Sequence, residues 1–304
     1  MPNRPSRTSQ KLAGLILMTG TYAKWSWILS ENVAEAQRRR LAELNLYPRL
    51  RFRLYEQGWF HRIISLLDRV FLQSQLVYMV LRKRFFEDRI QAEIEQGATQ
   101  VVILGAGLDP GGIRLAGNHP EIRVWEIDRV SLPISQSGNA NPENLHCITA
   151  NLADTTWTTQ LQSHPYWQST AKTVFAAEGL LMYLEADAVR RLIGALKQMT
   201  PDRGSFYFSF LRTSAWGKPR YGNFSPLVRL GLSLVGEPLR WSINPEEIST
   251  FLDQHGLTSE RTSDEADLYQ LYLSKHPIWR NHPKPTIEFL AHAKWPKSDA
   301  GQHP

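Results

Sequence analysis

Residues 101–109 read VVILGAGLD, and this stretch decides the fold. Its four apolar residues predict a buried strand, and Gly105 and Gly107 form a tight turn directly after it. Asp109 and Pro110 then predict the start of a helix, with the aspartate as N-cap and the proline at the first helical position. A strand, a glycine turn and a helix in this order are typical of a doubly wound α/β fold, in which ligands bind beyond the carboxyl ends of the strands.

The glycine turn does not complete a nicotinamide dinucleotide fingerprint. That fingerprint needs a third glycine three positions after the second, where this chain has Pro110. The turn therefore favours a Rossmann-like sheet and counts against a dinucleotide-dependent oxidoreductase.

Beyond the turn, apolar stretches alternate with helical patterns. This alternation predicts an α/β fold of the Rossmann-like class, with seven mostly parallel strands and helices on both faces. The strands are expected at residues 101–104, 123–127, 145–149, 173–177, 205–211, 257–262 and 268–274. A long helix is expected over residues 186–199, and a second over residues 245–255, where Gly256 ends it.

The remaining segments are expected to surround this core. Residues 1–94 show helical apolar spacing and many aromatic side chains, which predicts a helical cap that belongs to the same domain. Residues 95–275 form the expected core. Within it, residues 212–240 are rich in glycine, proline and aromatic residues and predict a lid insertion. Residues 276–304 contain five prolines and are expected to form a C-terminal extension.

Composition narrows the classes of function. The chain has 304 residues, of which 42% are hydrophobic and 21% charged, as in ordinary globular proteins. Cys147 is the single cysteine, so an intramolecular disulfide and a cysteine-based metal site are excluded, no metal is expected, and a cytoplasmic location with a buried thiol is predicted. No apolar run reaches the ~18–20 residues that span a bilayer, so no stable membrane insertion is expected.

The net positive charge lies near the N-terminus. Residues 1–60 hold ten Lys and Arg against four Asp and Glu, which accounts for the whole charge of +6. Such a segment could contact an acidic partner, a membrane surface or nucleic acid, but a solvated helix face is the simpler interpretation. We expect a small-molecule substrate and no nucleic acid partner. The apolar segments Leu12–Met18 and Trp25–Ile28 also raise the alternative of a peripheral membrane enzyme.

Polar side chains follow three of the expected strands. Asp128 ends the second strand about 20 residues after the glycine turn, where a carboxylate can accept hydrogen bonds from ribose hydroxyls. Asn151 follows the third strand and could read an adenine edge, and Glu178 follows the fourth and could hold an ammonium group. Each could alone be a helix cap or a solvated side chain. Together, on one edge of one sheet, they predict a ligand that contains a nucleoside.

The motifs that carry these residues resemble those of the leucine carboxyl methyltransferase family, a branch of the class I S-adenosylmethionine-dependent methyltransferases. The similar segments are LGAGLD at 104–109, WEID at 125–128, NLAD at 151–154, EGLLMYL at 178–184, Arg82-Lys83-Arg84 ahead of the first strand, and the segment 241–247. The resemblance covers roughly residues 80–275. It implies the Rossmann-like methyltransferase fold and S-adenosylmethionine as cofactor.

The resemblance also implies roles for single residues. The cofactor would contact Arg82, Gly105, Gly107, Asp109, Asp128, Asn151, Leu152 and Glu178. In the family's pattern, Arg82 would pair with the methionyl carboxylate and Glu178 would hold the amino group or fix the methionyl end. Asp128 would hold the ribose, and Asn151 and Leu152 would flank the adenine.

The predicted function is methyl transfer to a carboxylate or hydroxyl of a small, partly apolar metabolite, which Tyr183 would face. A carboxylate is ionised near neutral pH and needs no general base, whereas a hydroxyl needs one. Tyr183, His146 or a histidine nearer the C-terminus could serve, so the catalytic residue stays unassigned.

The alternative is an inactive relative that binds S-adenosylmethionine or S-adenosylhomocysteine and acts as a partner-binding protein. It is suggested by two departures from the family pattern, the altered turn at Pro110-Gly111-Gly112 and the missing lysine. Asn151 is a further departure, because an aspartate is common at its position. The N-terminal lysine that some family members use has Lys11 and Lys24 as candidate counterparts.

Overall fold

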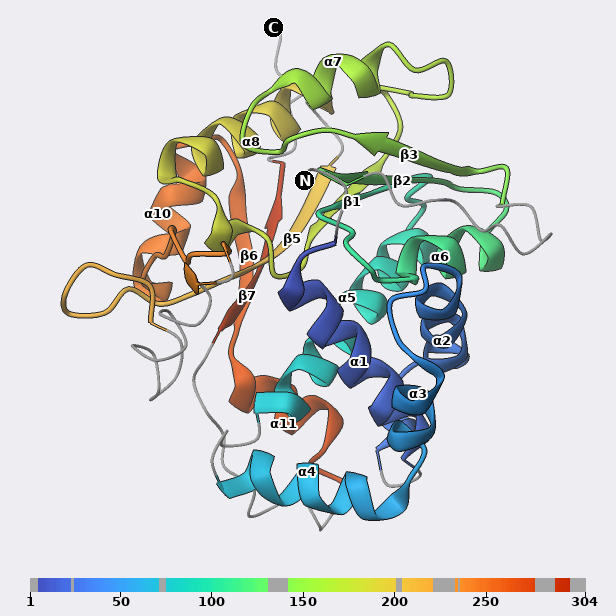
Figure 1. Cartoon of the computed structure of the whole chain (residues 1–304). Helices are drawn as coiled ribbons and strands as arrows, with labels where there is room; N and C mark the ends of the chain where they lie inside the picture. The colour runs from blue at the N-terminus through green and yellow to red at the C-terminus, as the bar shows by residue number, and fades with distance from the viewer. Residues whose placement is uncertain are drawn as a thin grey trace, which may run out of the picture.

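One mixed sheet organises the molecule and lies between two layers of helices (Figure 1). The computed structural model describes residues 5–22, 25–70, 75–130, 142–200, 204–220, 233–234, 236–276 and 288–295. Within these residues the sheet has seven strands, in the order β3-β2-β1-β4-β5-β7-β6. The strands β1 to β5 pair in parallel, and β7 runs antiparallel to both of its neighbours. The predicted Rossmann-like fold class is confirmed.

The strands lie close to their predicted positions over most of the chain. They are β1 (Gln100–Leu104), β2 (Arg123–Asp128), β3 (Leu145–Thr149), β4 (Thr173–Ala177), β5 (Gly204–Phe210), β6 (Thr258–Ser263) and β7 (Phe289–Lys294). Successive residues of β1 serve opposite layers, as the pleat of a strand requires: Val102 and Leu104 belong to one core cluster and Val101 to the other.

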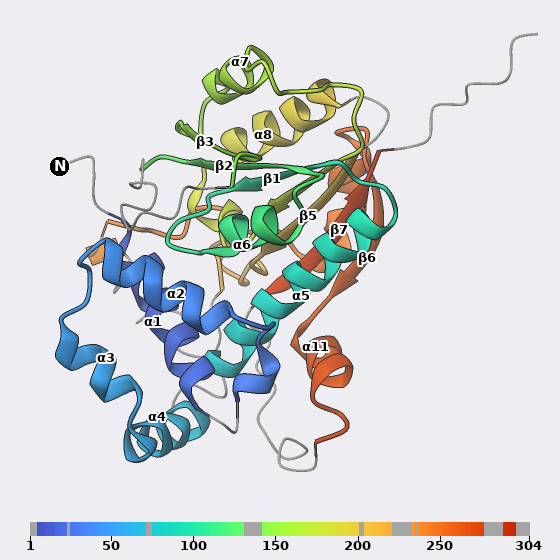
Figure 2. The same cartoon turned by 90° about the vertical axis from the view of Figure 1, so that its right-hand side faces the viewer.

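Helices cover both faces of the sheet (Figure 2). One layer holds α7 (Thr156–Gln162), α8 (Ala186–Met199), η3 (Pro245–Glu247) and α10 (Ile248–Asp253). The opposite layer holds α5 (Gln75–Glu95), α6 (Gly111–Asn118) and α11 (Glu265–Tyr272). The short 3₁₀ helix η2 (Leu181–Tyr183) follows β4. Trp125 and Trp157 fill the first core, and Tyr78 and Phe85 the second.

A group of N-terminal helices packs beyond α5. Its members are α1 (Arg7–Thr21), η1 (Ser26–Ile28), α2 (Val33–Glu43), α3 (Arg49–Tyr55) and α4 (Gly58–Val70). Ile16 of α1 shares a core cluster with Leu81 of α5 and Val101 of β1, so α1 is anchored to the sheet through α5. Figure 1 places α4 at the end of the molecule farthest from the sheet. The division into cap, core and extension stays a prediction.

Two expectations about the C-terminal part were wrong. Residues 268–274 were expected as a strand, but they fall mostly in the helix α11. Asp264 explains the difference: its carboxylate accepts from the Asp267 amide at 3.0 Å, and Asp267 accepts from the Asp264 amide at 3.1 Å, which caps the helix. The seventh strand is instead β7, inside the segment that was expected to form an extension. The expected lid insertion lies largely outside the described residues.

Two local expectations also need correction. The helix α6 begins at Gly111, with Pro110 in the N-cap position rather than inside the first turn. The Asp109 carboxylate still caps a backbone amide, since it accepts from Gly111 N at 2.8 Å. Cys147 is exposed rather than buried, because it lies on β3 at the edge of the sheet, where one side of the strand faces solvent.

Candidate cofactor site

A cavity of about 990 Å³ lies at the carboxyl ends of β1 to β4. The strand order reverses between β1 and β4, and open α/β sheets bind ligands in the crevice at such a point. All nine predicted site residues line this cavity: Arg82, Gly105, Gly107, Asp109, Asp128, Asn151, Leu152, Glu178 and Tyr183. The fold therefore brings these residues together around one cavity.

The glycine turn and the end of β2 are joined through Asp128. Gly105 and Gly107 have φ angles of +73° and +58°, which are left-handed conformations that favour glycine. The Gly107 amide donates to Asp128 Oδ2 at 2.9 Å, and the Val130 amide donates to Asp128 Oδ1 at 3.0 Å. Each carboxylate oxygen keeps a further acceptor position, so Asp128 can still accept hydrogen bonds from a ligand.

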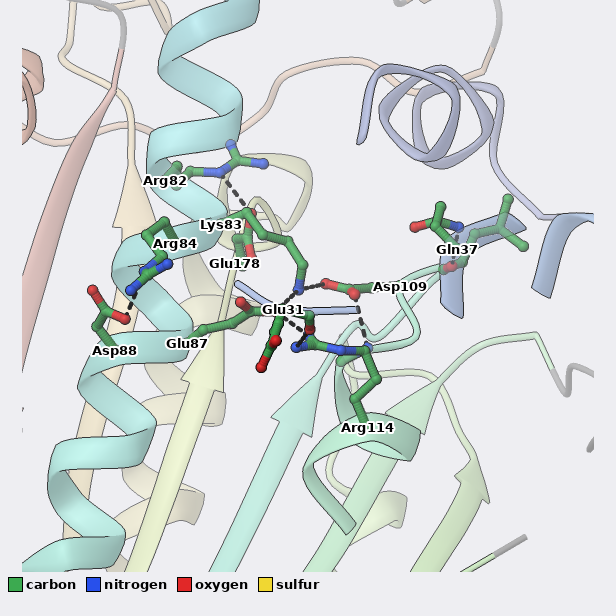
Figure 3. A network of polar contacts seen from close by, with 12 residues as sticks. Glu31, Gln37, Arg82, Lys83, Arg84, Glu87, Asp88, Asp109, Arg114 and Glu178 are labelled. Carbon is green, nitrogen blue, oxygen red and sulfur yellow. Dashed lines mark hydrogen bonds and ion pairs between the residues drawn. The ribbon is translucent and has the colours of Figure 1, made fainter. Parts of the chain in front are cut away.

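The buried guanidinium of Arg82 holds Glu178 in place (Figure 3). Arg82 Nε donates to Glu178 Oε1 at 3.0 Å, and Arg82 Nη1 donates to Glu288 Oε2 at 2.6 Å. Burial opposes the charge, but the two carboxylates outweigh it and raise the pKa of Arg82. Burial also raises the pKa of Glu178, against the opposing effect of Arg82. A cation from a ligand beside Glu178 would therefore be stabilised.

Lys83 forms a second set of ion pairs beside the first (Figure 3). Its Nζ lies 2.7 Å from Asp109 Oδ2 and 3.0 Å from Glu87 Oε1, and Arg114 Nη1 lies 2.7 Å from the same Glu87 oxygen. Burial alone would raise the pKa of Glu87, but Lys83 and Arg114 lower it to about 2. These pairs fix the start of α6, which follows the glycine turn, against α5.

The helix α1 covers the glycine turn through contacts that sequence reasoning missed. The Leu108 amide donates to Ser9 Oγ at 2.9 Å, and a Cβ on Gly107 would lie 2.8 Å from that oxygen. At the start of α1, the Arg7 and Thr8 amides donate to the Glu237 carboxylate at 2.7 and 3.3 Å. The local signal in the sequence is Ser6, which precedes α1 as its N-cap and marks the start of this helix. Nothing in the sequence links α1 to Glu237.

The candidate bases differ in their surroundings. Tyr183 lines the cavity, and burial together with the charge of Glu288 raises its pKa to about 12, so the phenol stays protonated at neutral pH. His146 packs against Trp125, with ring centroids 4.5 Å apart, and does not line the cavity. Of the two lysine candidates, Lys11 lines the cavity, and Lys24 lies outside the described residues.

The buried Glu126 on β2 gives a prediction about stability. Burial, with smaller contributions from Asp109 and Asp128, raises its pKa from 4.5 to about 7, although Arg40 opposes the shift. The folded state therefore holds more protons than the unfolded state between these pH values. The raised pKa of Glu126 therefore stabilises the folded state fully below pH 4.5, and this stabilisation is lost as the pH rises through about 7. The loss lowers the free energy of unfolding by about 3 kcal/mol.

The measurement is urea unfolding at several pH values between these limits. We expect Glu126→Gln to remove about 3 kcal/mol of the decrease in unfolding free energy with pH. The matched control is Glu143→Gln, which changes an exposed glutamate and should leave the decrease intact. An unchanged decrease in Glu126→Gln would show that this carboxyl is not responsible.

Comparison with known proteins supports the resemblance read from the motifs. The family model for leucine carboxyl methyltransferase matches residues 66–197. A Mycobacterium bovis protein named "Putative S-adenosyl-L-methionine-dependent methyltransferase" is 30% identical over 221 residues, which make up 70% of this chain and 63% of that protein. A similarly named protein from Parafrankia sp. is 32% identical over 125 residues, or 38% of each chain. The predicted family resemblance is confirmed.

The chain spans less than two thirds of the length of these curated relatives. Among solved structures, a DUF574 family protein from Streptomyces avermitilis aligns with a TM-score of 0.57 at 15% identity, covering 79% of this chain and 91% of that one. At this identity the likeness shows a shared fold.

Proposed function

We propose that this chain is an S-adenosylmethionine-dependent O-methyltransferase, because the family model for leucine carboxyl methyltransferase matches its residues 66–197. The proposal is carried by one observation: Asp128 and Glu178, at the ends of β2 and β4, line one cavity with the glycine turn between them. A carboxylate for ribose hydroxyls and a carboxylate for an ammonium group match the two ends of this cofactor.

The residues present fit the nucleoside end of the cofactor. Asp128 is held by two backbone amides and has acceptor positions left for the ribose. Leu152 is a buried apolar neighbour for the adenine. The exposed Asn151 already accepts from the Ala153 amide at 3.2 Å and has its amide group for a base edge.

The residues at the other end fit the methionyl group. Glu178 would hold the ammonium, and Arg82 fixes Glu178 from behind while it could also meet the carboxylate. When bound, S-adenosylmethionine supplies an activated methyl group, so the protein needs mainly to position the acceptor, an effect worth roughly 7–11 kcal/mol of the barrier. The helix α1 would exclude water from this end, and Tyr183 would donate a hydrogen bond to the acceptor.

The surroundings of the cavity favour a carboxylate acceptor. The Tyr183 phenol stays protonated at neutral pH and is a poor general base. His119 lines the cavity, but its Nδ1 lies 3.0 Å from Glu121 Oε1 and its Nε2 lies 2.9 Å from Gln91 Oε1, so both ring nitrogens are engaged. An acceptor that is already ionised needs neither group. Leu12, Leu15 and Met79 give the cavity an apolar side for the rest of the acceptor.

The test is transfer of a labelled methyl group to matched pairs of apolar carboxylic acids and alcohols. We expect the label in base-labile methyl esters of the acids, at a rate that changes little above about pH 6, because a carboxylate with a pKa of about 4 is already ionised there. Transfer to the alcohols alone would contradict the carboxylate assignment. Binding of S-adenosylhomocysteine without transfer to any acceptor would favour the inactive relative.

A further inference from the structure

The helix α4 turns its apolar side toward solvent. Trp59, Ile63, Leu66 and Leu67 follow the spacing i, i+4, i+7 and i+8, so they form one stripe along the helix. Their exposed fractions are 57%, 48%, 62% and 42%. A stripe with this spacing normally faces the core of a globular protein, so its exposure here calls for an explanation.

Polar contacts on the opposite side of α4 fix this orientation. His61 and Asp68 lie seven residues apart on that side, and both are buried. His61 Nε2 contacts the Tyr55 carbonyl oxygen and lies 3.4 Å from Thr21 Oγ1. The Asp68 carboxylate accepts from the Leu76 amide at 2.9 Å. Turning the apolar stripe inward would break these contacts. The contacts therefore keep the stripe on the solvent side of α4.

Exposed basic residues lie on α4 itself and on the neighbouring helix α3. On α3, Leu50 is 76% exposed, and Arg49, Arg51 and Arg53 are exposed beside it. On α4, Arg62 lies one turn from Trp59 and is also exposed. Figures 1 and 2 both show α3 and α4 next to each other at the periphery, away from the sheet. We call this surface the α3–α4 face, formed by Arg49, Leu50, Arg51, Arg53, Trp59, Arg62, Ile63, Leu66 and Leu67.

We propose that the α3–α4 face docks on an anionic lipid bilayer. Exposed Trp, Ile and Leu side chains flanked by arginines are the pattern of helices that lie in the plane of a membrane interface. The arginines complement negatively charged lipid headgroups, and the apolar side chains can enter the boundary between headgroups and acyl chains. None of the helices that the structure describes has the length and apolar character that spanning a bilayer requires.

A second copy of this chain fits the face less well. A twofold interface would place the same surface against itself, and the four arginines would then face one another across a desolvated contact. The segments Leu12–Met18 and Trp25–Ile28 fit less well than the α3–α4 face, because Leu15–Met18 of α1, Trp25 and Ile28 are buried and the exposed Trp27 ring stacks on His276.

Vesicle flotation of the full chain tests the proposal without relying on methyl transfer. We expect the protein to float with vesicles that contain phosphatidylserine and to stay behind with phosphatidylcholine alone, and about 0.5 M salt should weaken the binding. The double variant Trp59→Ser with Leu66→Ser should bind at least about tenfold more weakly. Trp216→Ser is the matched control, because Trp216 is 87% exposed outside this face and should leave binding unchanged.

A second variant separates charge from apolar contact. Arg49→Gln with Arg53→Gln should reduce the preference for anionic vesicles while thermal unfolding stays as in the unmodified protein. The proposal is overturned if the unmodified protein does not float, or if the Trp59→Ser, Leu66→Ser variant binds as well as the control. A concentration-dependent dimer in sedimentation velocity that the same variant abolishes, without vesicle binding, would assign the face to a second copy instead.

Discussion

Replacing Arg82 with methionine is expected to lower the free energy of unfolding by about 3–5 kcal/mol. The substitution keeps an unbranched apolar stem but removes the guanidinium that pairs with Glu178 at 3.0 Å and with Glu288 at 2.6 Å. Glu288 is fully buried and the Glu178 side chain is 17% exposed, and a buried carboxylate that loses its cation bears the cost of desolvation. Urea denaturation measures the loss directly.

A neighbouring ion pair on the same helix provides the control. Arg84 Nε lies 2.8 Å from Asp88 Oδ1, but both side chains are partly exposed, so Arg84→Met should cost less than about 1 kcal/mol. Adding Glu178→Gln and Glu288→Gln to Arg82→Met should recover much of the loss, because neutral amides need no cation. Equal losses in the Arg82 and Arg84 variants would contradict the importance of the buried pairs.

Replacing Asp128 with alanine is expected to weaken binding of S-adenosylhomocysteine by about 100-fold or more. The proposed hydrogen bonds from the ribose hydroxyls end on a charged acceptor, and bonds of this kind are each worth about 1.5–3 kcal/mol. The substitution also removes the acceptor of the Gly107 and Val130 amides, so the glycine turn keeps only its backbone bond from Gly105 N to Ile127 O as a link to β2. Calorimetric titration gives the dissociation constant.

The control for this variant is Asp154→Ala in the adjacent motif. Asp154 is partly exposed, accepts from the Thr156 amide at 3.0 Å and does not line the cavity, so binding should be unchanged. Asp128→Asn keeps one acceptor oxygen and should bind with intermediate affinity. If Asp128→Ala binds as tightly as Asp154→Ala, the ribose is held elsewhere.

The parts of the fold that local patterns determine were predicted closely. The strands 145–149 and 173–177 and the helix Ala186–Met199 have the predicted bounds, because apolar composition and flanking turn residues define them locally. The stretch 268–274 was misread because its apolar residues suit a buried helix as well as a strand, and the helix cap at Asp264 decides between them. The last strand was missed because its partners in β5 lie some 80 residues earlier in the chain.

The same division applies to the candidate site. Asp128 and Glu178 could be predicted, because each follows a recognisable strand and parallel strands end at one edge. The contact of Glu288 with Arg82 could not be predicted, because 206 residues of sequence separate the two. The contact of Glu237 with Arg7 could not be predicted for the same reason, since the separation is 230 residues. The solvent exposure of the apolar stripe on α4 could not be predicted either. The spacing of apolar residues shows that a helix has an apolar and a polar side, but it does not show which side faces the core.

The central claim is that the cavity at the carboxyl ends of β1 to β4 binds S-adenosylmethionine. The most direct test is calorimetric titration of the unmodified protein with S-adenosylhomocysteine. We expect one site with a dissociation constant of about 1–100 μM, together with a rise in the midpoint of thermal unfolding. No heat of binding and no shift of the midpoint, in a protein whose cooperative unfolding shows that it is folded, would contradict the claim.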